Sequence, residues 1–125
     1  MPHHLRRLVR YGLLLLALAL GSSLPAYAQD ISGALTKLAA DRYADTGEAI
    51  ADLATSGHPR AAIIVQAIQD KTLEFDAATK TVAIRTGSTV VDAATGAAIA
   101  SPPAGLSPVR VNNRVRSAIA AAMGA

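Results

Sequence analysis

The hydrophobic periodicity of this 125-residue chain changes sharply near Lys71. Before that residue, apolar side chains recur at intervals of three and four, which is typical of amphipathic helices. After it, apolar and polar residues alternate in LEFD (73–76) and TVAIR (81–85), which indicates two strands of a β-hairpin. A chain whose helices and strands are segregated in this way is expected to fold as an α+β domain, here a mainly helical one.

Two of the three helices expected before Lys71 are recognised by their apolar stripes. ISGALTKLAADRY (31–43) begins beside Ser32, which is a suitable N-cap. RAAIIVQAIQDK (60–71) follows Pro59, and proline is tolerated in the first turn of a helix. The side chains expected to face inward from this later helix are Ile63, Ile64, Ala67 and Ile68.

The helix between them, ADTGEAIADLATS (44–56), has a capping signal at its start and a stop signal at its end. The side chain of Asp45 or Thr46 can accept hydrogen bonds from the first free backbone N–H groups of the helix. Glu48 lies three residues after Asp45, as in a capping box. Gly57 occupies the position after the helix that favours glycine. The helices on either side of this glycine are expected to form a hairpin of the HEAT-repeat type, with one apolar stripe each.

The next part of the chain is expected to extend the β-hairpin and then enter a loop. Residues 88–91 (STVV) indicate a third short strand, DAATG (92–96) a turn, and residues 97–100 a return along that strand. SPPAGLSP (101–108) has the composition of a loop. These assignments give a helical, HEAT-like hairpin region (29–71), a β-hairpin and loop insertion (72–108), and a strand-to-helix junction with a C-terminal helix (109–125).

The last helix is expected within VRVNNRVRSAIAAAM (109–123). Val109 and Val111 alternate with a polar residue and are expected to be extended, and either Asn112 or Asn113 can be the N-cap of the helix that follows. The residues that then recur at helical spacing are Val115, Ala118, Ile119, Ala122 and Met123.

The polar residues of this segment are the candidate contact residues of the chain. Cations in the first turn of a helix oppose its dipole, so Arg114 and Arg116 are expected to be held by specific acceptors. Glu74 and Asp76 of the predicted strands are candidates for that role, as are the acidic groups of a partner protein. The residues expected to make structural or partner contacts are Arg110, Asn112, Asn113, Arg114 and Arg116.

The first 28 residues have the organisation of a secretory signal peptide. A start with three arginines precedes the apolar run GLLLLALAL (12–20), and Ala26-Tyr27-Ala28 offers the small residues that signal peptidase requires. The apolar run is about half of the roughly 20 residues that span a bilayer, so cleavage is expected rather than membrane anchoring. The rest of the chain is therefore expected in the periplasm.

Removing this leader changes the charge of the chain. The whole sequence carries 12 basic and 9 acidic residues, net +3, but three of its arginines lie in the leader, so the remainder is neutral. A neutral domain lacks the basic surface that nucleic-acid binding requires. The absence of cysteine excludes disulfides and thiol chemistry. Because Tyr43 and Phe75 are the only aromatic residues after the leader, the core is expected to consist of Ala, Ile, Leu and Val.

Few residues are candidates for catalysis or metal binding. His58, the one histidine after the leader, lies beside a proline and is expected to be a polar turn residue. Glu48 and Asp52 are four residues apart on a predicted helix, which is typical of a solvated face. The sequence contains no metal-ligand spacing, nucleophile elbow or phosphate-binding glycine loop. We therefore expect no enzyme activity, no cofactor and no metal ion.

One segment connects the chain to a known family. VRVNNRVR (109–116), followed by an alanine-rich helix, resembles the N-terminal extracytoplasmic region of the urea ABC-transporter permease subunit, a branch of the branched-chain amino acid permease superfamily. DAATGAAI (92–99) is similar to the family's D-[ATL]-x-T-G-x-x-[hydrophobic] element. The leader ending in AYAQD, GHPR (57–60) between two helices, and the strands LEFD and TVAIR agree in order, so the resemblance covers residues 1–123.

The resemblance implies a non-catalytic, exported accessory domain of a urea-type ABC importer, in contact with the permease or the solute-binding protein. In the family this region leads into further helical repeats and a membrane-spanning permease, so the chain is expected to be truncated, with an apolar side of its last helix uncovered. Its location would be periplasmic, at the inner membrane only through the transporter or an uncleaved leader. A free-standing periplasmic helical-repeat adaptor, unrelated to transport, is the alternative.

Overall fold

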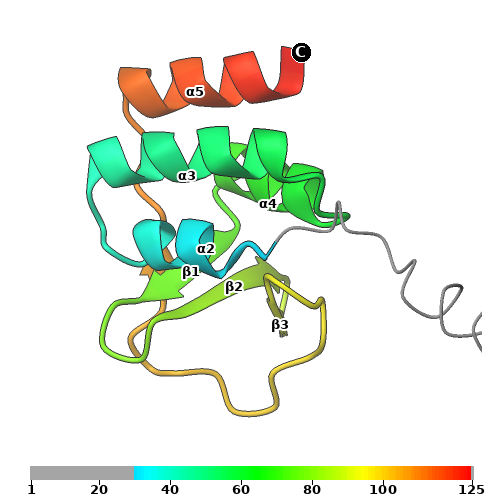
Figure 1. Ribbon diagram of the computed structural model, residues 1–125. Helices are drawn as coiled ribbons and strands as arrows, with labels where there is room; N and C mark the ends of the chain where they lie inside the picture. The colour runs from blue at the N-terminus through cyan, green and yellow to red at the C-terminus, as the bar shows by residue number, and fades with distance from the viewer. Residues whose placement is uncertain (1–29, 125) are drawn as a thin grey trace, which may run out of the picture.

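The computed structural model describes residues 30–124; the expected signal peptide, Gln29 and Ala125 lie outside the described residues. The described part contains four helices and one four-stranded sheet (Figure 1), so the predicted α+β class is confirmed. The helices are α2 (Ser32–Leu38), α3 (Tyr43–Ser56), α4 (Ala61–Gln69) and α5 (Asn113–Gly124). The strands are β1 (Leu73–Asp76), β2 (Thr81–Thr86), β3 (Thr89–Asp92) and β4 (Ser107–Pro108).

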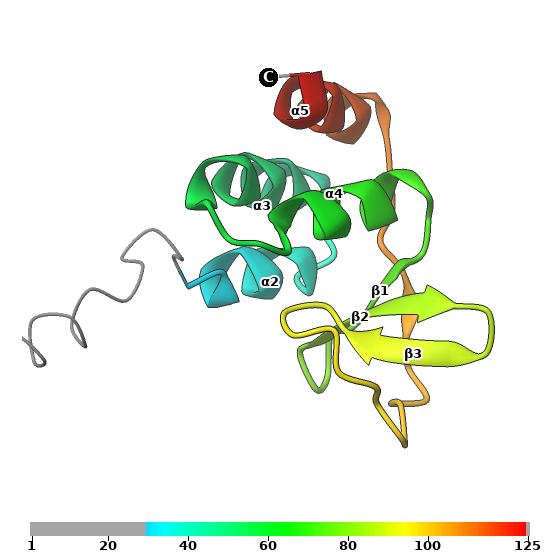
Figure 2. The same cartoon turned by 90° about the vertical axis from the view of Figure 1, so that its right-hand side faces the viewer.

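The helices form the upper part of the molecule, and the sheet lies below them (Figures 1 and 2). α3 is the central helix, because α2 packs on one side of it and α5 on the opposite side, while α4 contacts both α3 and α5. The side chains of Ala49, Ile50 and Leu53 are the apolar ones that α3 buries. β1 follows α4 directly and contacts it, which attaches the sheet to the helical layer.

The core is aliphatic, as the composition predicted. Phe75 is the only aromatic side chain in it among the described residues, and its other members are Ala, Ile, Leu and Val. The largest side chains that are fully buried are Leu38, Ile50, Leu53, Ile64, Ile68, Leu73 and Val115. Since these seven come from all four helices and from β1, a single core holds the two layers together.

The starts of α2 and α3 differ from the prediction. Ser32 is not an N-cap but lies inside α2, where its backbone N–H and its hydroxyl both donate to the carboxylate of Asp30, each at 2.9 Å. These hydrogen bonds stabilise the ionised carboxylate and lower the pKa of Asp30. α3 begins at Tyr43 with no side-chain hydrogen bond at its N-cap, so the predicted capping box is wrong. Asp45 instead forms an ion pair with Arg42 at 2.8 Å.

A residue with a left-handed backbone conformation follows each of α2, α3 and α4. Gly57 follows α3 with φ 68°, which confirms the predicted glycine stop. α2 ends at Leu38 and is shorter than predicted, and Asp41, with φ 56°, lies in the turn between α2 and α3. Lys71, with φ 62°, separates α4 from β1 in the same way. Residues other than glycine are uncommon in this conformation, which explains why the sequence did not reveal these stops.

The inward face of α4 is rotated relative to the prediction. Ile64, Ala67 and Ile68 are buried as expected, but Ile63 is 47% exposed, so its inward assignment is wrong. Val65 is buried instead. Because successive helical residues are about 100° apart, a stripe centred between Ile64 and Ile68 includes Val65 and leaves Ile63 outside.

The sheet is antiparallel with the strand order β3-β2-β1-β4. The predicted β-hairpin is confirmed, with Leu73 of β1 opposite Ile84 of β2. The third predicted strand is β3, which begins one residue later than expected. The expected return of residues 97–100 consists of one bridge, between Val91 and Ala98.

The end of the predicted loop belongs to the sheet. Ser107 and Pro108 were assigned to a loop by composition, but they form β4 and pair with β1. The backbone N–H of Val109 continues this pairing by donating to the carbonyl of Leu73 at 2.9 Å. Without β4, this side of β1 would be an open sheet edge with free N–H and C=O groups. A pairing with a strand so far back in the chain leaves no local signal in the sequence.

Both faces of β1 are covered. Its apolar residues belong to the core, while Glu74 and Asp76, on the alternate positions, are only 8% exposed. Arg85 of β2 donates two hydrogen bonds to the Glu74 carboxylate, at 2.8 and 3.0 Å, and this contact raises the pKa of Arg85. Asp76 lies under the loop near Gly105, where an added Cβ would come within 3.2 Å of its carboxylate. Asp76 also accepts the backbone N–H of Ala78 at 2.9 Å, so both buried carboxylates of this strand are hydrogen-bonded.

Both the backbone conformation and the neighbouring side chain favour glycine at position 96. Its φ is 78°, in the left-handed region. A Cβ at this position would lie 2.6 Å from Nη1 of Arg60, whose Nε donates to the carbonyl of Ala93 at 2.8 Å. This arginine thus ties the start of α4 to the turn after β3, and only glycine leaves room for it.

Replacement of Gly96 by alanine is expected to lower the free energy of unfolding by about 2 kcal/mol, from backbone strain and from the displaced Arg60. Gly87→Ala is the matched control, because Gly87 has φ 62° but nothing within 4 Å of an added Cβ. We expect it to cost about 1 kcal/mol, from the backbone alone. Urea denaturation of both variants measures the difference, and equal losses would show that the Arg60 contact contributes nothing.

Candidate functional site

The segment 109–116 carries the chain from the sheet to α5. Val109 is buried and continues the pairing with β1, as the predicted extended start requires. Val111 is partly buried against the core. Val115 and Ile119 are the buried residues of α5, which packs on α3 and α4. The segment therefore joins the layers of the domain.

Asn112 is the residue that caps α5. Its Oδ1 accepts a hydrogen bond from the backbone N–H of Val115 at 3.0 Å, and its carbonyl accepts from that of Arg116 at 2.9 Å. A side-chain bond to the third residue of a helix is the usual N-cap contact. The structure thus decides between the two asparagines that the sequence left open. Asn113 is the first residue of α5, and its Oδ1 accepts from Nη1 of Arg116 at 2.6 Å.

Arg110 attaches the junction to the turn between α2 and α3. Its Nε donates to the carboxylate of Asp41 at 2.8 Å, and its Nη2 donates to the carbonyl of the same residue at 3.0 Å. Its guanidinium carbon lies 4.7 Å from the centre of the Tyr43 ring, within cation–π range. The hydrogen bond to Asp41 and the charge of that carboxylate raise the pKa of Arg110. We call these three residues the Arg110 clamp.

Arg114 and Arg116 do not reach the acidic residues of β1, so that part of the prediction is wrong. α5 lies at the top of the molecule and the sheet at the bottom (Figure 1). The Glu74 carboxylate is bound by Arg85, and that of Asp76 accepts a backbone N–H of its own turn at 2.9 Å. Within the described part of the chain, neither arginine of α5 forms an ion pair.

Arg116 borders a groove between the end of α4 and α5. The groove has a volume of about 540 Å³. Its apolar part is formed by Val111, Ile119 and Met123, and its basic side chains are Lys71 and Arg116. The other lining residues are Gln69, Ala120 and Gly124. We call this feature the α4–α5 groove.

The sequence did not identify Lys71 as a contact residue. Its only signal was its position just after a predicted helix, where basic residues commonly interact with the last carbonyl groups. The groove became visible only when folding placed this lysine beside the face of α5 that carries Arg116.

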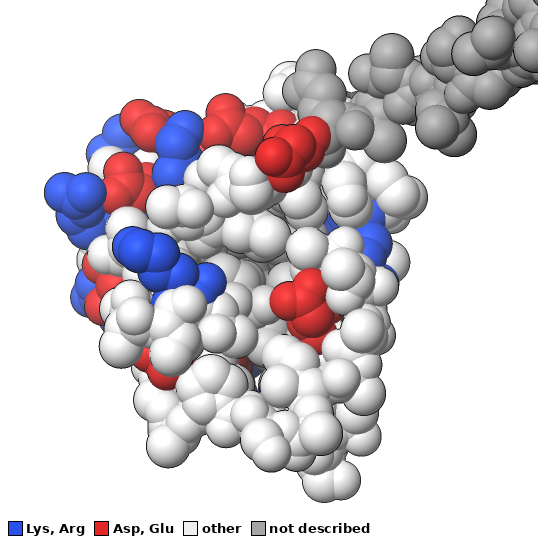
Figure 3. Space-filling view, turned by 60° about the horizontal axis from the view of Figure 1, so that its bottom comes forward, with Lys and Arg blue, Asp and Glu red and all other residues white. Residues whose placement is uncertain are grey.

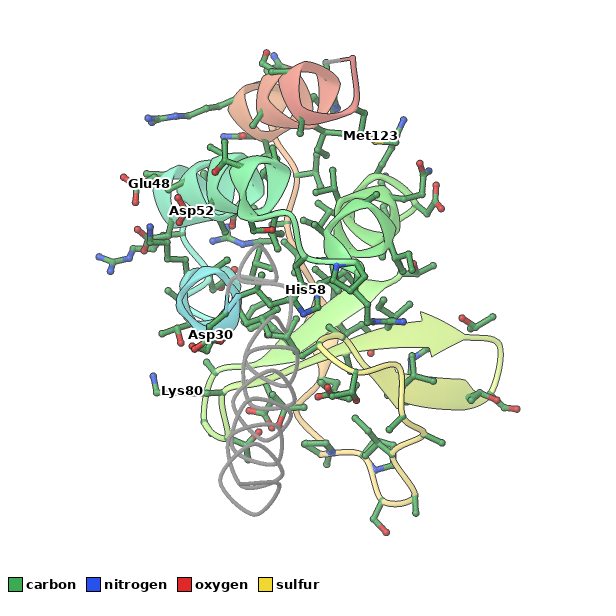
Figure 4. All side chains as sticks on the ribbon, turned by 45° about the vertical axis from the view of Figure 1, so that its right-hand side comes forward. Asp30, Glu48, Asp52, His58, Lys80 and Met123 are labelled. Carbon is green, nitrogen blue, oxygen red and sulfur yellow. The ribbon has the colours of Figure 1, made fainter. Side chains whose placement is uncertain are left out.

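A second, more apolar groove lies on the other side of Met123. It has a volume of about 380 Å³ and is formed where α3, α4 and α5 meet. Leu53, Ala61 and Val65 contribute to its apolar lining, and His58 belongs to its border. Met123 is 45% exposed and lines both grooves, at the end of α5 that faces α4 (Figure 4). We call this feature the end groove.

His58 has the turn role that the sequence predicted. It lies between the helices and the sheet (Figure 4), and its Nδ1 accepts the backbone N–H of Arg60 at 3.1 Å. Its own backbone N–H donates to the hydroxyl of Ser56, also at 3.1 Å. Since Nδ1 is an acceptor, the neutral ring carries its proton on Nε2. Within residues 30–124, no group of three His, Asp or Glu side chains could hold a metal ion.

Glu48 and Asp52 lie on the outer side of the helical layer (Figure 4). Nζ of Lys37 is 2.7 Å from the carboxylate of Asp52 and 3.6 Å from that of Glu48. The hydrogen bond with Asp52 is the main cause that raises the pKa of Lys37. All three side chains are substantially exposed, so the predicted solvated face is confirmed.

The sheet side of the molecule is poor in charge. Figure 3 shows a broad area without charged side chains on this face. The connection 93–108 contains no Lys, Arg, Asp or Glu. Charged groups gather instead over the helices, where the Arg110 clamp and the α4–α5 groove lie.

Comparison with known proteins identifies no relative. No family model, no curated protein and no solved structure matches the chain. Among residues 30–124, no helix has the length and apolar character needed to cross a membrane.

The cap on α5 can be tested by replacing the two asparagines separately. Asn112→Ala is expected to lower the free energy of unfolding by about 1 kcal/mol, because the Val115 N–H loses its acceptor. Asn113→Ala is the control, since it removes only an exposed contact with Arg116. Urea denaturation compares them. A loss from Asn113→Ala as large as that from Asn112→Ala would contradict the assignment of the cap.

The charge in the Arg110 clamp can be removed by Asp41→Asn, because asparagine also tolerates the left-handed backbone at this position. We expect a small loss of stability that shrinks at about 1 M NaCl, since both side chains are partly exposed and salt screens their attraction. Thermal melts at low and high salt measure it. Arg42→Gln, which breaks the local pair with Asp45, is the control. A loss that is independent of salt would show that the clamp acts by packing alone.

Proposed function

We propose that this domain is a non-catalytic, exported module that acts through protein contact, as an accessory domain of a urea-type ABC importer. The observation that carries the proposal is the pair of grooves along α5. The end groove is lined mainly by apolar side chains, and the α4–α5 groove combines apolar side chains with Lys71 and Arg116. A catalytic site would bring an acid, a base or a nucleophile together in a concave site. The grooves described here present an apolar surface with basic side chains at one end, which suits another protein.

The transporter part of the proposal is supported by the resemblance in residues 92–99 and 109–116. Both segments have demanding structural roles in this chain. Asp92 accepts hydrogen bonds from the backbone and the hydroxyl of Thr95, each at 3.0 Å, and Gly96 makes room for Arg60. The second segment supplies the Arg110 clamp and the α5 cap. We infer that the resemblance reflects a shared structural framework.

The finer proposal for the fold is that α3 and α4 form a HEAT-like hairpin on which α5 stacks. The two helices are joined through Gly57 in a left-handed conformation. α5 packs on α3 from the side opposite α2. Helices stacked in successive layers, each in contact with its neighbours, support a solenoid-like arrangement.

A free-standing periplasmic adaptor is the second candidate, and the outer face of α5 favours it. Val115 and Ile119 of the apolar stripe are buried, and Met123 is the large apolar residue of this helix that stays exposed, at 45%. The outward positions are occupied by Arg114, Ser117, Ala121 and Gly124. A small and polar outer face is typical of the terminal element of a helical stack.

Copurification distinguishes these candidates. The full chain, with its own leader and a C-terminal tag, is expressed in cells that also produce the urea importer. We expect it to retain the permease or the solute-binding protein after mild solubilisation, and both are identified by immunoblot. The components of a branched-chain amino acid importer, probed in the same sample, control for specificity. Recovery of neither urea component, or equal recovery of the control importer, would reject the transporter assignment and favour the adaptor.

A further inference from the structure

Lys71 and Arg116 are basic side chains that no carboxylate neutralises within residues 30–124. Ion pairs hold four other basic residues in that range, namely Lys37, Arg42, Arg85 and Arg110. Arg60 donates to a backbone carbonyl. Those with neither an ion pair in the range nor a hydrogen bond to a backbone carbonyl are Lys71, Lys80, Arg114 and Arg116. The domain is neutral as a whole, yet it concentrates unneutralised positive charge at the start of α5 and the end of α4.

The α4–α5 groove brings two of these cations to one apolar surface. None of its lining residues is Asp or Glu. Asp70 precedes Lys71 in the chain, but it does not line the groove and accepts a hydrogen bond from Gln66 at 3.0 Å. Arg116 gives one N–H to Asn113, and a guanidinium group has five. Both cations therefore have donors available for an acidic ligand.

We propose that the α4–α5 groove binds an acidic, amphipathic segment of a partner protein. The apolar side chains of the segment cover Met123, Ala120 and the exposed part of Val111, and its carboxylates pair with Lys71 and Arg116. Recognition of this kind joins an amphipathic segment to a hydrophobic groove. The charge complementarity selects an acidic segment over a basic one.

The shape of the site favours a protein segment over a small molecule. Sites for small molecules bury most of the ligand surface, whereas Lys71, Arg116 and Met123 are exposed side chains at an open groove. A longer segment continues past Met123 into the end groove, whose lining includes no Lys or Arg. The segment is therefore expected to carry acidic residues towards one end and apolar residues towards the other.

The inference rests on the proposed function only in taking protein contact as the role of the domain. A direct peptide-binding experiment tests the groove separately from the transporter assignment. Intact peptide binding without copurification of the urea importer removes the transporter assignment alone. Absent peptide binding, with copurification that survives K71E and R116E, removes the groove alone.

Peptide binding to the full exported chain tests the groove. The probe is a fluorescent helical peptide with leucines along one face and glutamates beside them. One comparison peptide has lysine in place of glutamate, and the other has serine in place of leucine. Fluorescence anisotropy is expected to show that the acidic leucine peptide binds at least about tenfold more tightly than either, because each comparison removes one half of the complementarity.

Charge reversal at the groove has matched controls elsewhere in the chain. K71E and R116E are each expected to weaken binding of the acidic peptide by about tenfold, since attraction becomes repulsion. K80E controls for K71E, because Lys80 has φ 56° and lies at the opposite end of the molecule from Met123 (Figure 4). R114E controls for R116E, because Arg114 lies about 200° from Arg116 around the same helix. Neither control is expected to change the affinity.

Circular dichroism melts verify that each variant is folded. If a charge-reversal variant does not fold, Lys71→Gln or Arg116→Gln is used in its place. Equal binding of the three peptides would overturn the proposal. Equal losses from the groove variants and their controls would do the same, since binding would then depend on overall charge. Self-association of the chain that K71E and R116E abolish would also overturn it, because the occupant would be a second copy.

Discussion

The packing of α3 between α2 and α5 is the constraint on which the domain depends. The helix contacts both neighbours while burying a single face, which contains Thr46 and Ser56 as well as its aliphatic residues. α5 reaches its place only because the segment after β4 crosses from the sheet to the helices. The Arg110 clamp and the Asn112 cap fix this crossing at both ends. With one aromatic residue in the core, stability depends on this close packing of small side chains.

Features determined by neighbouring residues could be predicted from the sequence. The alternation in LEFD and TVAIR was enough for the first two strands, and a glycine after an apolar stripe was enough for the end of α3. Features determined by residues far away in the sequence could not be predicted. Arg110 finds its acceptor 69 residues earlier, in Asp41, and β4 exists only because β1 offers an edge. The rotation of α4 that exposes Ile63 is likewise a result of tertiary packing.

The candidate site shows the same limit. The sequence identified Arg116 but not Lys71, because the two meet only in the folded chain. Residues 30–124 carry equal numbers of acidic and basic residues, so the described part of the chain has no net charge. This neutrality concealed a local imbalance, since most basic residues outside the groove are paired or bound to backbone while Lys71 and Arg116 are not. The pairing of charges, rather than their number, determines what such a surface can bind.

The way the sheet ends has a consequence for the solubility of the chain. Exposed strand edges pair with other molecules, and small sheets are therefore prone to aggregate through them. Here the turn after β3 folds back on that strand, and β4 covers β1. Pro108 has no backbone N–H, so the outermost strand is a poor template for another strand. The sheet thus offers only short edges to another strand, since one bridge lies along β3 and the outer strand β4 has two residues.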